Sequence, residues 1–143
     1  MVCFSFDDYE TWISPYPYEV YVSQFKRWLS LWEKGLQALT DVQGDRAKEL
    51  LLCAEVAYIH FKSDLLQTQF SYYKREKEKN KHAIAKILDE EKELTERLLA
   101  VAAENPAVGF EASNHYFYNE RNLIEKILQT NILKYELLTE DLK

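Results

Sequence analysis

The feature that most constrains the fold is a run of large apolar residues spaced four and three apart. Such spacing puts every member on one face of an α-helix for about three heptads. Pro17 suits a first helical turn, so the helix is predicted to begin there. Gly35 lies within it and is interpreted as a point where another backbone comes close. The members of the run are Tyr18, Val22, Phe25, Leu29, Trp32, Leu36 and Leu39.

A second helix is predicted from Asp45, an N-cap candidate after the turn at 40–44, to about Lys77. Two neighbouring apolar stripes run along it, which is typical of a central helix with two or more neighbours. Cys53 falls in this apolar run and is expected in the core. The stripes consist of Ala47, Leu51, Ala54, Tyr58, Phe61 and Leu65, and of Leu52, Val56, Ile59, Leu66, Phe70 and Tyr73.

Two more helices follow. The third carries an apolar stripe from Ile84 to Val101, in which Glu91 takes the place of an apolar residue, and Pro106 is expected to end it. Asn119 is the predicted N-cap of the last helix. Its apolar stripe consists of Ile124, Leu128, Tyr135 and Leu138.

The chain contains only three Gly and three Pro, too few for the turns of an all-β or βαβ fold. Amphipathic helices with short links bury their stripes best by packing antiparallel. The sequence therefore predicts an all-α protein: an antiparallel bundle of about four helices over residues 17–143. An irregular N-terminal arm is expected over 1–16, and a structured loop before the last helix.

Charge and composition exclude several classes of function. A net charge of −6 gives no electrostatic reason to bind nucleic acid or an anionic membrane. No segment approaches the roughly 20 apolar residues of a membrane span. Two cysteines without tight spacing predict neither a zinc site nor a disulfide framework, and the cytoplasm is the expected location. Without a Glu-x-x-His pair or a Gly-rich phosphate loop, neither a metal site nor a cofactor is expected.

The segment 105–118 is longer than a link between antiparallel helices needs. It gathers carboxylate, amide, imidazole and phenol groups, which suit a hydroxyl-rich ligand such as a sugar. In the alternative interpretation, its aromatic rings plug the bundle end and its polar groups pair with loop carbonyls. Trp12, Tyr16 and Tyr18 leave a similar choice between an aromatic platform and packing of the arm. The predicted sugar-binding residues are Glu111, Asn114, His115, Tyr116 and Tyr118.

Segments 94–99, 108–118 and 122–128 resemble the C-terminal helical region of large bacterial proteins similar to glycoside hydrolases. Residues 8–35 look like that family's join between a catalytic barrel and the helices. The resemblance implies carbohydrate metabolism and a barrel as partner. No βα repeats precede the helices here, so no catalytic residue carries over.

Three functions follow. The leading prediction is an accessory helical domain of a glycoside-hydrolase-like protein, which helps to wall a carbohydrate site and is not catalytic alone. The alternative is a stand-alone helical protein-interaction module that docks a protein partner or a second copy. A small hydrolase using Glu111 and His115 is a third, weakened by the lack of a second positioned acid in the same segment.

Overall fold

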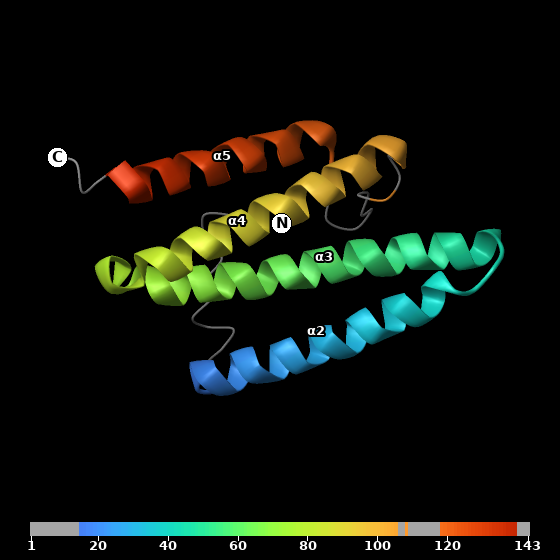
Figure 1. Cartoon of the computed structure of the whole chain (residues 1–143), viewed down its shortest axis with the longest axis horizontal. Coiled ribbons are helices and arrows are strands. Elements are labelled where there is room, and N and C mark those ends of the chain that lie inside the picture. Colours follow the sequence, from blue (N-terminus) through green and yellow to red (C-terminus); the bar gives the residue numbers. More distant parts are fainter. Residues whose placement is uncertain (1–14, 106–107, 109–117, 140–143) are drawn as a thin grey trace. The chain divides into compact units, whose positions relative to one another are not determined.

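A computed structural model describes residues 15–105, 108 and 118–139. This part of the chain holds four helices and no strand, so the all-α helical-bundle prediction is confirmed (Figure 1). The helices are α2 (Tyr18–Thr40), α3 (Asp45–Lys74), α4 (Lys77–Glu104) and α5 (Glu120–Thr139). The chain divides into two compact units, Met1–Leu65 and Leu66–Lys143, and α3 contributes to both.

The helix ends follow local chemistry. Pro17 directly precedes α2, and Gly44, with a φ of 115°, directly precedes α3. Asn105 ends α4 in a non-helical conformation, with φ −134° and ψ 80°, in keeping with the bias of a residue before proline against the α region. The predicted N-cap Asn119 is confirmed, because its Oδ1 accepts a hydrogen bond of 2.8 Å from the backbone N–H of Asn122.

One boundary differs from the prediction. The second helix was expected to reach Lys77, whereas α3 ends at Lys74 and Lys77 already begins α4. The side chain of Asn80 stabilises the break by donating to the carbonyl oxygens of Tyr73, at 3.2 Å, and Glu76, at 3.0 Å. The charged residues that follow Lys74 thus form a turn between α3 and α4 and do not continue one long helix.

In the first unit, α2 packs antiparallel to the first part of α3. Trp32 donates from Nε1 to the carbonyl oxygen of Ala54, at 3.0 Å, and the Tyr58 hydroxyl donates to Glu33. The rings of Trp28 and Phe61 meet edge to face with their centroids 4.5 Å apart. Trp28 therefore meets a residue further along α3 than Trp32 does, so the two segments run in opposite directions, as Figure 1 shows.

In the second unit, α4 packs against both α5 and the end of α3. Ile84, Leu88 and Leu137 form its buried cluster, against which Phe70 and Tyr73 of α3 also pack. Asp89 of α4 forms an ion pair with Lys134 of α5, and Glu91 with Lys126. These pairs run in opposite order along the two helices, so α4 and α5 are antiparallel.

Two expectations about single residues are wrong. Cys53 is exposed and carries a free thiol, although it lies in an apolar run. Within the described part of the chain, nothing lies within 4 Å of a Cβ built on Gly35, so no other backbone of that part comes close there.

Leu29 and Leu31 provide a matched test of how α2 packs. Leu29 is 4% exposed and Leu31 58% exposed. Leu29→Ala should lower the free energy of unfolding by about 2–5 kcal/mol, because it leaves a cavity. Leu31→Ala should change it by less than about 0.5 kcal/mol. Urea denaturation measures both, and equal effects would contradict this orientation of α2.

Gly35→Ala should stabilise the chain by about 0.5–1 kcal/mol, because alanine restricts the unfolded chain and favours the helix. The open space around Gly35 admits the methyl group without a shift. Gly44→Ala is the control and should destabilise, since the φ of 115° at Gly44 is strained for any residue with a Cβ. Thermal unfolding followed by circular dichroism should move the two melting temperatures in opposite directions.

Candidate functional site

Four of the five predicted sugar-binding residues, Glu111, Asn114, His115 and Tyr116, lie outside the described residues. Tyr118 is described: it is half-buried and directly precedes the cap residue Asn119. The predicted arm over 1–16 also lies outside, apart from Pro15 and Tyr16. The sugar site therefore stays a prediction.

Glu91, which interrupts the apolar stripe of α4, is buried and forms an ion pair with Lys126 of α5. The Glu91 side chain is 9% exposed and that of Lys126 22%. A carboxylate in such a place requires a cation, because an unpaired buried charge is costly. We assign the pair a structural role: it fixes which side of α5 faces α4.

Removing one member of this pair should be far more damaging than removing both. Lys126→Met should cost roughly 3 kcal/mol of unfolding free energy, because it removes a cation from beside the buried Glu91 carboxylate. Glu91→Leu combined with Lys126→Met should restore most of the loss, since two apolar side chains then meet. Chemical denaturation measures both variants.

The control is Lys134→Met, at the more exposed pair with Asp89, whose side chain is 50% exposed. Exposed pairs contribute less, so this variant should cost under about 1 kcal/mol. Equal losses at Lys126 and Lys134 would contradict a special role for Glu91.

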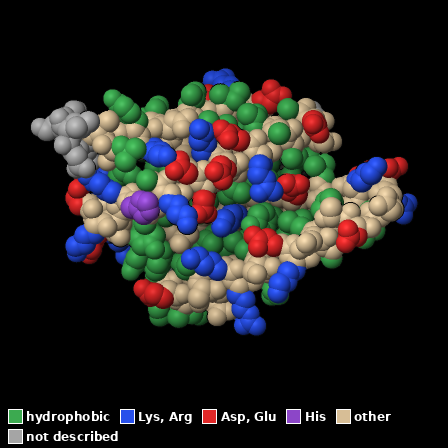
Figure 2. Space-filling model, in the orientation of Figure 1, with side chains coloured by type: hydrophobic (Ala, Val, Ile, Leu, Met, Phe, Trp, Pro, Cys, Tyr) green, Lys and Arg blue, Asp and Glu red, His purple; other side chains and the backbone are tan. Residues whose placement is uncertain are grey.

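A different side of α5, away from its ion pairs with α4, exposes a long apolar face. Its exposed fractions run from 46% at Ile124 to 69% at Tyr135, with Leu128 and Leu138 both at 56%. With Asn131, these residues recur at spacings of four and three, as along one side of a coiled-coil helix. We call this set, Ile124, Leu128, Asn131, Tyr135 and Leu138, the outer seam of α5. Hydrophobic side chains are visible over α5 in Figure 2.

The sequence prediction for this helix is therefore wrong about its buried face. Leu123, Thr130 and Leu137 are the buried residues of α5. With the half-buried Ile127 and Lys134, they make an inner seam, which is the outer seam shifted by one residue, or about 100° around the helix.

A second apolar surface lies on the N-terminal half of α2. Its residues surround an open groove of about 350 Å³. Inside it the rings of Phe25 and Trp28 lie edge to face, 5.2 Å apart, and Tyr16 at its rim is 62% exposed. Of the proposed aromatic platform, Tyr16 lines this groove and Tyr18 does not. The lining residues are Tyr16, Val20, Tyr21, Gln24, Phe25 and Trp28.

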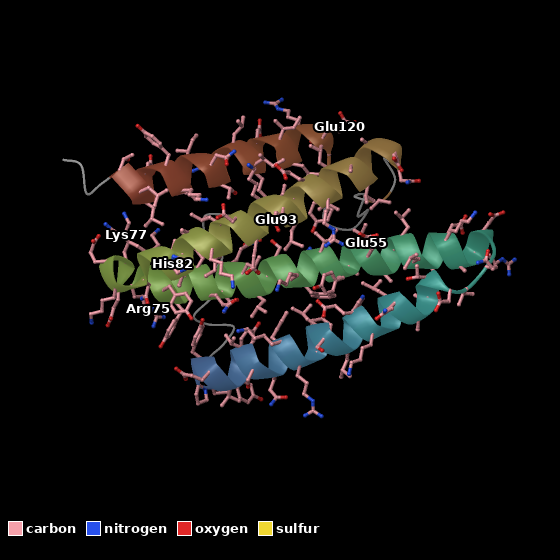
Figure 3. All side chains as sticks on the ribbon, in the orientation of Figure 1. Glu55, Arg75, Lys77, His82, Glu93 and Glu120 are labelled. Atoms are coloured by element: carbon pink, nitrogen blue, oxygen red, sulfur yellow. The ribbon has the colours of Figure 1, made fainter. Side chains whose placement is uncertain are left out.

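The polar side chains of the described residues offer less support for a catalytic or metal site than the apolar surfaces do for an interaction site. His60 Nε2 lies 3.6 Å from Asp64 Oδ2 one turn along α3. His82 is exposed near the start of α4, and Figure 3 labels it together with Arg75 and Lys77 of the same turn region. Among the described residues, no three His, Cys, Asp or Glu side chains gather in a way that could hold a metal ion. Nor, in that same part of the chain, is any helix long and apolar enough to cross a membrane.

Comparisons of the chain with protein-family models, curated proteins and solved structures found no match. What the chain does must therefore be inferred from its own side chains. The outer seam of α5 is the surface whose exposed apolar residues are most regularly spaced, so the inference starts from it.

Proposed function

We propose that this chain is a helical protein-interaction module that binds a partner helix along the outer seam of α5. The observation that carries the proposal is the regular exposure of four large apolar side chains on one helix face, Ile124, Leu128, Tyr135 and Leu138. Scattered exposed apolar residues are normal on a protein surface, but large apolar side chains gathered along one helix face are typical of an interaction site. A partner with matching four-and-three spacing would bury it as helices do in a coiled coil.

The accessory role beside a glycoside-hydrolase-like barrel is one form that this function could take. The helices around such a barrel are surfaces of the required kind. Sugar binding by Glu111, Asn114 and His115 would be an additional property, and it stays a prediction. A cytoplasmic location is also proposed, because an exposed free thiol at Cys53 suits a reducing compartment.

Photo-crosslinking tests the proposal. A benzophenone amino acid replaces Tyr135, and a second version of the chain carries it at Leu50 of α3, which is 55% exposed. On irradiation in cells of the source organism, position 135 should form an adduct with a polypeptide and position 50 should not. The adduct should map to a helix with four-and-three apolar spacing, and Leu128→Glu should abolish it because a buried carboxylate would oppose docking.

Equal adducts at both positions, or an adduct at 135 that survives Leu128→Glu, would contradict the proposal. So would no adduct at 135. Circular dichroism of the Leu128→Glu variant provides the folding control, since Leu128 is exposed and its replacement should leave the helix content unchanged.

A further inference from the structure

Building on the proposed function, we propose that the partner of α5 is the α5 helix of a second copy of this chain, bound antiparallel. The outer seam has the residues of a self-complementary surface: large apolar side chains with a single amide, Asn131, near the middle. Two-fold dimers require one patch to complement itself. The argument for this occupant rests on register and on charge.

Register comes first. Overlapping two antiparallel copies of α5 (Glu120–Thr139) fully puts Ile124 opposite Tyr135 of the second copy, and Leu128 opposite Asn131 of the second copy. The two Asn131 residues then lie about 4.5 Å apart along the axis, three residues at 1.5 Å each. At that separation their amides can hydrogen-bond across the pair. A single polar residue in an apolar seam fixes register in this way, at some cost in affinity.

Charge selects the direction. In this register Arg121 of each copy lies within about one turn of Glu136 of the other, on the same side of the seam. Both residues are exposed, and the Arg121 side chain, 85% exposed, already pairs with Glu125 at 3.1 Å. A parallel pair would instead place Arg121 opposite Arg121. Opposite charges at both ends of the seam therefore favour the antiparallel dimer.

Sedimentation equilibrium of the purified chain across a dilution series tests self-association. Wild type should approach twice the 17.0 kDa mass of one chain as concentration rises. Leu128→Glu should remain at one-chain mass, because it puts a carboxylate in the centre of the interface. The matched control Leu50→Glu, at an equally exposed leucine of α3, should dimerise like wild type. Dimers retained by Leu128→Glu, or lost in Leu50→Glu, would overturn the proposal.

Charge reversal tests the direction. Arg121→Glu and Glu136→Arg should each raise the dissociation constant at least about fivefold, because each puts like charges at both ends of the seam. The double reversal should return it to within about twofold of wild type. A parallel dimer would not respond this way, since like residues face each other before and after every change. Single variants without effect, or a double variant without recovery, would overturn the antiparallel register.

The crosslink at position 135 separates this inference from the proposed function. A wild-type chain that stays at one-chain mass, with an adduct at 135 to a helix of another polypeptide, would overturn self-association and leave the interaction module intact. Assemblies larger than two chains would indicate a head-to-tail contact and would also overturn the two-fold dimer. No adduct at 135 with any polypeptide would overturn both.

Discussion

The ion pair between Glu91 and Lys126 determines which side of the last helix is available to a partner. A buried carboxylate needs its cation on the facing helix, so α5 must turn Lys126 toward α4. Leu137 then enters the core beside Ile84 and Leu88. Since a helix advances about 100° per residue, the seam that begins one position later must face elsewhere. The exposure of Leu128 and Tyr135 follows from where the charges on α4 lie.

This dependence explains what the sequence could and could not predict. The four helices, the cap at Asn119 and the end before Pro106 depend on local chemistry, and they appear as the pattern indicated. The ends of α3 differ in detail, because it stops at Lys74 and Asp45 is its first helical residue and not its cap. The buried face of α5 depends on α4. The outer seam has one polar residue, Asn131, whereas the inner seam has two, Thr130 and Lys134, so hydrophobicity alone favours burial of the wrong seam.

The predictions for two single residues were wrong for a related reason. Cys53 and Gly35 were interpreted from their neighbours in sequence, but burial depends on whether another element covers that side of the helix. Each lies on a side of its helix that remains exposed. Glu91 shows the opposite case: the sequence showed that it takes the place of an apolar residue in the stripe, and only the structure shows that it is buried and that Lys126, 35 residues later, is its partner.

The acidity of the chain bears on how two copies could meet. Each copy carries a net charge of −6, so copies repel at long range, and added salt would screen that repulsion and favour association. Added salt would also weaken attraction between Arg121 and Glu136, which opposes association. Because these effects have opposite signs, the salt dependence of association alone does not measure the attraction between Arg121 of one copy and Glu136 of the other. Exchanging the two charges keeps the net charge constant, so recovery in the double variant would isolate their attraction from the overall repulsion.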